Sequence, residues 1–385
     1  MGELKLKKKM WLLFIIFISL GFPDGLLGSG WPEIRNTFHF ETEVVGILTM
    51  GIFIFSFLSS LMYTRLIAKL GLEKILQGST LVIILGLLLF SALRTPVGMI
   101  SSIIFLGIGA GCIDVAINDY VSFYYNEKIM SWVHAFWGIG ISFGSGVMSI
   151  VLFNGLGWFY SYYIIAFLEL CILIILIFNR MEAAPQHSDK QEKSKVKLTK
   201  LHYLGPLYYF CYGIEYVVGL YFSTFLLVNY SLSSGEAAFQ VSLYWTFLMV
   251  GRFFTGFLIS YMSVKKIVSI HLLISFLGGL LLLSQQNNFI LVASILMGYG
   301  FSALYPMMMR LPYDIYNNEV ASKIVAYQVG FQYLGVIILP VVCGFIFNYT
   351  SLNLFPISIL TAILIMALAF KRLYSFKDKN FNKGG

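Results

Sequence analysis

Long apolar stretches recur along the whole chain and are separated by short polar connections. Residues 10–20, 81–93 and 359–370, for example, include no charged side chain. A helix needs about 20 apolar residues to cross the hydrocarbon core of a membrane, and it satisfies its own backbone groups there. The pattern therefore predicts an all-α membrane protein with twelve transmembrane helices, at 10–30, 44–69, 74–94, 97–123, 129–154, 158–179, 203–229, 236–261, 266–285, 288–310, 321–347 and 351–372.

Composition supports this fold class. Only 11% of the residues are charged and 58% are hydrophobic, with a mean hydropathy of +0.82. Basic residues gather near both chain ends and at every second predicted connection, within 5–9, 65–74, 190–200, 265–266 and 371–383. This distribution follows the positive-inside rule and does not suggest a nucleic-acid partner. We expect a multi-pass protein of the cell membrane with both termini in the cytoplasm.

One long polar stretch divides the chain near its middle. We expect an N-terminal six-helix half at 1–180, a cytoplasmic linker at 181–200, and a C-terminal six-helix half with a short cytoplasmic tail at 201–385. An internal repeat supports the division, because 66–76 resembles 258–268. The glycines of 109–111 pair more weakly with those of 298–300. Two parallel halves around a midplane binding site are typical of secondary transporters.

Ionisable side chains inside the predicted spans are the best candidates for function. An ionised group in the bilayer costs several kcal/mol unless it faces a cavity or a partner, so such groups tend to be functional. They are Asp24, Asp114, Asp119, Glu169, Glu215 and Arg252. We expect Asp119 to make a structural contact near the cytoplasm. Glu169, on a peripheral helix, is either functional or merely paired or neutral.

Asp24 and Asp114 are the two principal acids. Asp24 lies between Pro23 and Gly25, where a bend in the first span would favour a carboxylate that binds a proton or cation; the alternative is that it caps a broken helix. Asp114 and Asn118 are spaced i, i+4 and share one helical face. A carboxylate beside an amide suits a polyhydroxy ligand. The alternative is a polar pair that braces neighbouring helices.

The second half supplies further candidates. Glu215 lies in the middle of the seventh span, where it can face a cavity. Arg252 can neutralise a cavity acid or brace its own half through an ion pair. His134 can relay protons near neutral pH or make packing hydrogen bonds, and Gln328 pairs with it in the internal repeat. Aromatic residues such as Trp137 and Tyr305 can stack on a sugar, although aromatic residues are also frequent at membrane interfaces.

The sequence lacks the patterns of an enzyme or an ATP-driven pump. No phosphate-binding loop ends in Lys-Ser or Lys-Thr, and His and Cys residues do not occur at metal-binding spacings. The four cysteines lie within apolar segments and suggest no disulfide. We expect no enzymatic activity and no cofactor, so that transport is driven by an ion gradient or by the gradient of the substrate itself.

Residues 111–121 resemble the fucose permease family, the fucose–galactose–glucose:proton symporters of the major facilitator superfamily. Asp114, Asn118 and Val121 match the family pattern, whereas Asp119 stands where the family has proline. Residues 249–260 are similar to its eighth-helix signature, 305–306 to its tenth, and 138–140 to its fifth. The resemblance implies the major facilitator fold, with Asp24 and Asp114 as the proton and sugar pair.

The fifth helix departs from the family. His134 and Trp137 occupy positions where the family has Gln and Asn, which contact sugar there, so the preferred substrate can differ. With this departure in view, the expected substrate-binding residues are Asp114, Asn118, His134, Trp137, Glu215, Arg252, Tyr305 and Gln328, and the proton-coupling residues are Asp24 and Asp114.

The expected function is a symporter for a sugar or similar polyhydroxy compound, coupled to protons or alternatively to sodium, and active as a monomer in the lipid bilayer. A drug or metabolite exporter with the same fold is the first alternative. A transporter-like sensor that binds its ligand without moving it is the second.

Overall fold

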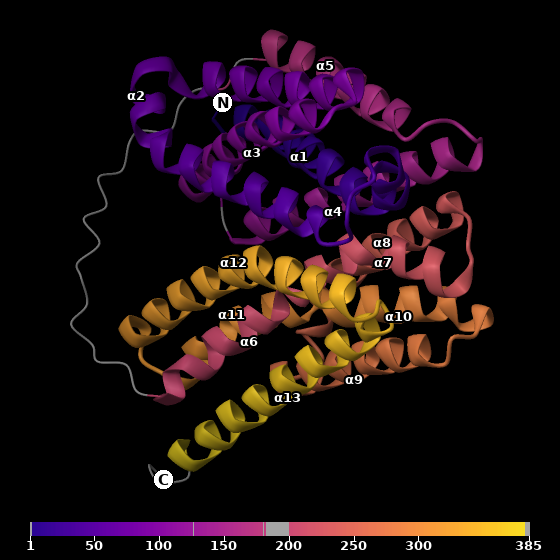
Figure 1. The fold of residues 1–385 in the computed structure, drawn as a ribbon. Helices are drawn as coiled ribbons and strands as arrows, with labels where there is room; N and C mark the ends of the chain where they lie inside the picture. The colour runs from indigo at the N-terminus through magenta and orange to yellow at the C-terminus, as the bar shows by residue number, and fades with distance from the viewer. Residues whose placement is uncertain (1, 126, 180, 182–199, 382–385) are drawn as a thin grey trace.

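The computed structural model describes residues 2–125, 127–179, 181 and 200–381, so most of the predicted linker, 182–199, lies outside the described residues. The described chain is helical throughout (Figure 1). Its helices are α1 (Gly2–Phe38), α2 (Val44–Leu93), α3 (Pro96–Tyr124), α4 (Glu127–Phe153), α5 (Phe159–Phe178), α6 (Leu204–Tyr212), α7 (Ile214–Tyr230), α8 (Ser234–Leu258), α9 (Val264–Leu283), α10 (Ile290–Ser302), α11 (Leu304–Ile315), α12 (Asn318–Tyr349) and α13 (Leu354–Phe381), with short 3-10 helices at Lys200–Tyr203 and Asn287–Phe289.

Helix α2 contains two membrane spans. It is 50 residues long, which at 1.5 Å per residue is roughly 75 Å, far more than one crossing requires. Gly71 interrupts it with φ 78° and ψ 161°, a conformation that only glycine adopts readily. The described residues include eleven helices that are long and apolar enough to cross a membrane, α2 among them. Because α2 turns back at Gly71, these amount to the twelve predicted spans.

The structure differs from the predicted spans at four places. The first span, predicted at 10–30, is one helix from Gly2 to Phe38. Residues 203–229, predicted as one helix, form α6 and α7 with a break at Gly213. Residues 288–310 form α10 and α11, which meet at Ala303 and end at Ile315. Helix α13 continues to Phe381 instead of ending at 372. The apolar pattern predicts which residues can lie in lipid. It does not predict where a helix is interrupted or where it continues into polar residues.

The helices form two groups, α1–α5 and α6–α13, which lie one above the other in Figure 1. Within the first group α1 packs on α4, and α2 packs on α3 and on α5. Within the second, α6 packs on α12 and α10 on α8 and α9. The groups meet where α4 contacts α8, α1 contacts α7 and α2 contacts α12. The position of the boundary between two halves stays a prediction.

Glycine pairs correct the proposed register of the internal repeat. A Cβ atom added to Gly107 would lie 2.5 Å from the carbonyl oxygen of Ile52 in the first part of α2. A Cβ atom added to Gly298 would lie 2.2 Å from the carbonyl oxygen of Tyr244 in α8. Gly109 instead faces the second part of α2, and Gly300 faces α9. Gly107 therefore corresponds to Gly298, and Gly109 to Gly300. In each group the fourth spanning segment fits between the second and third because these glycines allow close approach.

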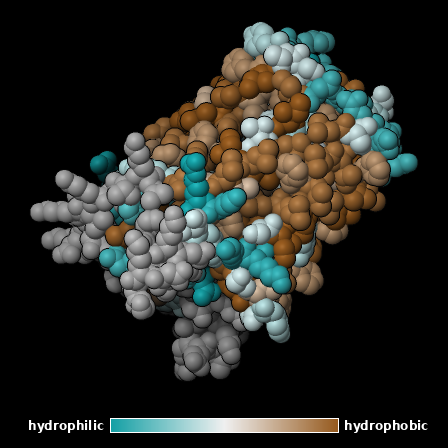
Figure 2. Space-filling view, turned by 90° about the horizontal axis from the view of Figure 1, so that it is seen from below, coloured by the Kyte–Doolittle hydropathy of each residue, from teal (hydrophilic) through white to brown (hydrophobic). Residues whose placement is uncertain are grey.

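The outer surface of the helices is apolar. Figure 2 shows a broad hydrophobic band on one face of the molecule, with hydrophilic residues toward its two ends. Large apolar side chains on both groups are strongly exposed, among them Phe57, Phe167, Phe178 and Leu368. A surface of this kind is stable in lipid and not in water. The expectation of an all-α multi-pass membrane protein is confirmed.

Candidate functional site

Direct contacts between the two helix groups concentrate at one end of the molecule. The Ser223 hydroxyl donates to the Gly28 carbonyl at 2.5 Å, and a Cβ at Gly46 of α2 would lie 2.7 Å from the Pro340 carbonyl oxygen of α12. A Cβ at Gly28 would lie 2.1 Å from the Gly219 carbonyl oxygen. These contacts, together with Ser149 donating to the Gly235 carbonyl and Ser234 donating to Glu33, are called the seam. The seam lies on the side predicted to face outward, and it closes that side.

Asp24 lies where the seam ends, midway along α1. Its carboxylate accepts a hydrogen bond from the Trp137 indole Nε1–H at 3.0 Å, and its side chain is exposed. Because Trp137 belongs to α4 and its ring also contacts Trp245 of α8, the exposed carboxylate lies where the two groups approach each other. Helix α1 continues through Pro23, so Asp24 does not cap a broken half-helix, and that alternative is wrong.

Asp114 and Asn118 form the expected pair on α3. The Asn118 amide donates to the Asp114 carboxylate at 3.0 Å, and both side chains are partly buried. The Asn118 Oδ1 is buried and has no hydrogen-bond partner. No hydrogen bond links the pair to another helix among the described residues, which argues against a bracing role. Asp114 interacts electrostatically with Asp24.

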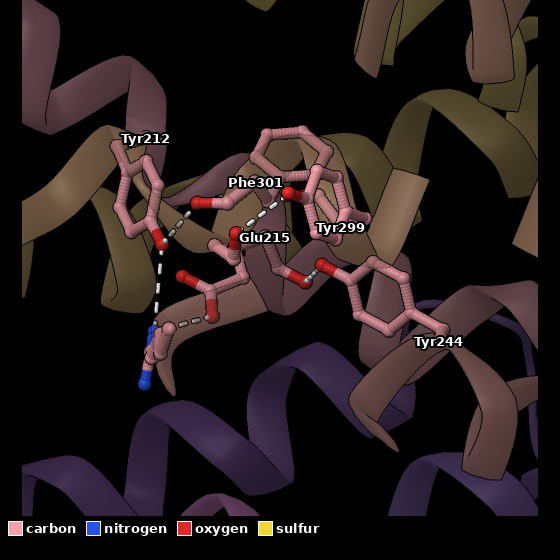
Figure 3. A network of polar contacts seen from close by, with 7 residues as sticks. Tyr212, Glu215, Tyr244, Tyr299 and Phe301 are labelled. Atoms are coloured by element: carbon pink, nitrogen blue, oxygen red, sulfur yellow. Dashed lines mark hydrogen bonds and ion pairs between the residues drawn. The ribbon is translucent and has the colours of Figure 1, made fainter. Parts of the chain in front are cut away.

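Glu215 and Arg252 form an ion pair in the second group. Arg252 Nη2 lies 3.1 Å from Glu215 Oε1, and the side chains are 18% and 3% exposed, respectively. Tyr212 lies 3.5 Å from the same guanidinium nitrogen, and Tyr244 donates to the backbone carbonyl of Glu215 (Figure 3). This arrangement fits the predicted ion pair that braces the second half. The Arg252 Nε remains buried without a hydrogen-bond partner.

Trp137 contacts both helix groups, because it lies between Asp24 of the first group and Arg252 of the second. The Arg252 guanidinium carbon lies 5.9 Å from the centre of its ring, within the range of a cation–π interaction. Trp245 of α8 packs edge-on against the same ring, with centroids 5.9 Å apart. Trp245 was not singled out from the sequence, because aromatic residues make up 17% of the chain and none is distinctive by itself.

His134 and Tyr305, two further predicted site residues, both lie near Arg252. His134 is exposed, packs edge-on against Phe17 of α1, and interacts electrostatically with Arg252. Tyr305 is partly buried and interacts electrostatically with Arg252 and Asp114. Both therefore belong with the polar residues described above, which together are called the central cluster: Asp24, Asp114, Asn118, His134, Trp137, Glu215, Arg252 and Tyr305.

Gln328 lies apart from that cluster. It is 1% exposed and lines a separate small pocket with His202 and Tyr316. In this conformation the structure does not bring Gln328 to the other candidates.

The remaining acids make structural contacts. Asp119 accepts a hydrogen bond from the Tyr63 hydroxyl of α2 at 3.0 Å. Glu169 is fully buried in α5, and its carboxyl group interacts with Ser19 of α1. No group of three or more His, Cys, Asp or Glu side chains suited to a metal ion occurs among the described residues.

The fold and this central polar cluster are those of a membrane transporter. A family model described as Major Facilitator Superfamily matches residues 13–225 and again 204–384. The chain belongs to the major facilitator superfamily, and the predicted fold is confirmed.

Two relatives in sequence are each 23% identical to this chain. An uncharacterized MFS-type transporter of Yersinia pestis is 23% identical over 357 residues, covering 86% of this chain and 88% of the relative. A probable nitrate transporter of Staphylococcus epidermidis, NarT, is 23% identical over 295 residues, covering 73% and 74%.

Solved structures share the fold. The nucleoside transporter NupG aligns with a TM-score of 0.77 at 14% identity, covering 95% of this chain and 99% of the other. FucP, a Major Facilitator Superfamily transporter in the outward conformation, aligns with a TM-score of 0.62 at 19% identity, covering 95% and 98%. The predicted resemblance to the fucose permease family is confirmed by this structural match. The chain is a transporter of a small molecule.

Proposed function

We propose that this protein is a proton-coupled symporter of a sugar or similar polyhydroxy compound, working by alternating access. The observation that carries the proposal is the position of Asp24, an exposed carboxylate in the middle of a membrane helix. It is held by Trp137, and it lies near the Asp114–Asn118 pair and across from the Glu215–Arg252 ion pair.

Asp24 is the proposed proton carrier. A carboxylate that is open to water on one side can exchange a proton, and desolvation disfavours its charged form when the site closes. Coupling to sodium is the alternative use of the same acid. Asp114 and Asn118 are the proposed binding residues, because the unpartnered Asn118 Oδ1 can accept a substrate hydroxyl. His134, Trp137, Tyr305, Glu215 and Arg252 would complete the wall of the site.

The charges of the cluster argue against an anionic substrate. Among the described residues of the cluster, Asp24, Asp114 and Glu215 are balanced by Arg252 alone, and that guanidinium is already engaged by Glu215. A nitrate ion would meet an excess of carboxylate, so the substrate named for the staphylococcal relative fits this cluster poorly. A neutral polyhydroxy compound fits better.

An exporter of cationic drugs is the second candidate, because surplus carboxylates beside Trp137 and Trp245 also suit an organic cation. A sensor that binds ligand without transport is the third.

The closed seam supports an inward-facing state of the cycle. With the seam on the outer side, the termini and the 181–200 linker would be cytoplasmic in a cell-membrane protein, as the basic residues predict. We propose that a single copy carries out the cycle, since all residues of the cluster come from one chain.

The test is uptake by proteoliposomes. The purified protein is reconstituted, an inward proton gradient is imposed, and a panel of labelled hexoses, pentoses and polyols is screened. We expect at least one to accumulate, and accumulation to collapse with a protonophore. The variant Asp119→Asn is the control, because that acid contacts Tyr63 outside the cluster. No gradient-stimulated uptake of any compound, with efflux of cationic dyes instead, would favour the exporter; binding without flux would favour the sensor.

A further inference from the structure

Trp137 is placed to do more than line a binding site. Its indole N–H donates a hydrogen bond to the Asp24 carboxylate of the first helix group at 3.0 Å, and its ring contacts the Arg252 guanidinium of the second helix group. Arg252 in turn is paired with Glu215. One unbroken series of contacts therefore runs from the exposed acid, through the indole, to the buried ion pair of the opposite group.

The backbone holds this series in place. A Cβ at Gly21 would lie 2.3 Å from the Trp137 carbonyl oxygen, so α1 and α4 touch one turn from Asp24. A Cβ at the neighbouring Gly138 would lie 3.1 Å from the Met249 Cβ of α8. Trp137 is thus fixed between the groups, among the contacts that α4 makes with α8.

The charge on Asp24 can change both contacts of the indole. A carboxylate polarises the N–H that it accepts and makes the ring more electron-rich, which strengthens its attraction for a guanidinium. Protonation of Asp24 turns a charge-assisted hydrogen bond into a neutral one, a change worth about tenfold in an equilibrium. The contact between Trp137 and Arg252 weakens at the same time.

We propose that Trp137 is a positioning residue that transmits the protonation state of Asp24 to Arg252 and so sets the stability of the closed seam. This inference rests on the proposed role of Asp24 in coupling. The seam is tightest while Asp24 is charged. When Asp24 is protonated and no substrate is bound, the open seam is favoured. The seam then closes only after substrate binds. A symporter needs this bias, because it prevents protons from crossing alone.

Other charged groups face Asp24 and are part of the argument. Among the described residues these are Asp114 of α3 and Tyr216 of α7, which interact with it electrostatically, with Arg252 of α8 beyond the indole and His134 on α4 near Arg252. Glu169 of α5 interacts with Ser19 of α1, and Ser19 lies more than one turn before Asp24 along α1. No hydrogen bond joins any of these groups to Asp24 among the described residues, whereas Trp137 bonds to Asp24 and also contacts the opposite group.

The test needs no identified substrate. Hydrogen–deuterium exchange of the full-length protein in lipid nanodiscs is measured at pH 5.5 and pH 8, with rates corrected for intrinsic exchange. We expect segments 24–36 and 219–236 of the seam to be protected about tenfold more at pH 8. In Trp137→Phe, which keeps a ring and removes the N–H donor, both pH values should give the weakly protected pattern. Asp24→Asn should do the same, and the double variant should add nothing.

Trp245→Phe is the matched control, because it alters an indole on α8 that packs on Trp137 without bonding to Asp24. It should keep the dependence on pH. If Trp137→Phe keeps that dependence as well, the inference is wrong while the proposed function stands. If the wild-type seam shows no dependence on pH, the coupling role of Asp24 fails, and the inference fails with it.

Discussion

The Glu215–Arg252 ion pair gives a quantitative prediction about stability. Replacing Arg252 by Met leaves a carboxylate with a 3% exposed side chain and no cationic partner. Breaking a buried ion pair from one side costs about 3–5 kcal/mol, mostly because an uncompensated charge remains. Glu215→Gln should cost less, since Arg252 is 18% exposed and keeps its contact with the Trp137 ring. The double variant Glu215→Gln/Arg252→Met should recover much of the loss, because it leaves no isolated charge.

The assay is thermal unfolding of the detergent-purified variants, followed by intrinsic fluorescence. A change of 1 kcal/mol moves Tm by about 2–4 °C in domains smaller than this chain, so we expect Arg252→Met to lower Tm by about 5 °C or more. Glu215→Gln should lower it by about half as much, and the double variant should be more stable than Arg252→Met. If instead the double variant shows the sum of the two losses, the residues act independently, and the ion pair does not brace the second group.

Three further predictions concern the seam, the buried acid and the topology. Gly28→Ala places a methyl group 2.1 Å from the Gly219 carbonyl oxygen and should hold the seam open, seen as faster deuterium exchange in 219–236; Gly78→Ala, which meets no atom within 4 Å, should leave the exchange unchanged. Glu169→Gln should express and elute as wild type because it introduces no charge, whereas Glu169→Lys should yield little folded protein on size-exclusion chromatography; equal yields would show that the site tolerates charge. A cysteine at the exposed Thr37 should react with an impermeant thiol reagent in intact cells and one at position 188 should not, and the reverse would overturn the predicted orientation.

Much of the fold could be predicted because lipid imposes a strong constraint on composition. The predicted span 158–179 and the observed α5, Phe159–Phe178, differ by one residue at each end. The turn at Gly71 was also expected, from the polar residues around it. The breaks at Gly213 and Ala303 were not predicted, since they lie inside predominantly apolar segments and depend on tertiary contacts such as the close approach of Gly213 to Gly335.

The site was predictable in part for the same reason. Asp24, Asp114 and Glu215 stand out because acids are costly in lipid, and the Asp114–Asn118 bond follows from helical spacing alone. The bond between Trp137 and Asp24 joins helices that are 113 residues apart in the chain, and no local pattern reports such a pairing. The internal repeat suggested Gln328 as a counterpart of His134, but the structure places it in a different environment.

The most direct test of the account is a comparison of accumulation with exchange in Asp24→Asn proteoliposomes, using the sugar identified by the uptake screen. Asparagine keeps the size and the acceptor for the Trp137 N–H while fixing the neutral state. The account predicts that uptake against a gradient is lost, whereas exchange of labelled for unlabelled sugar continues at a rate comparable with wild type. Concentrative uptake by Asp24→Asn under the same proton gradient would contradict it.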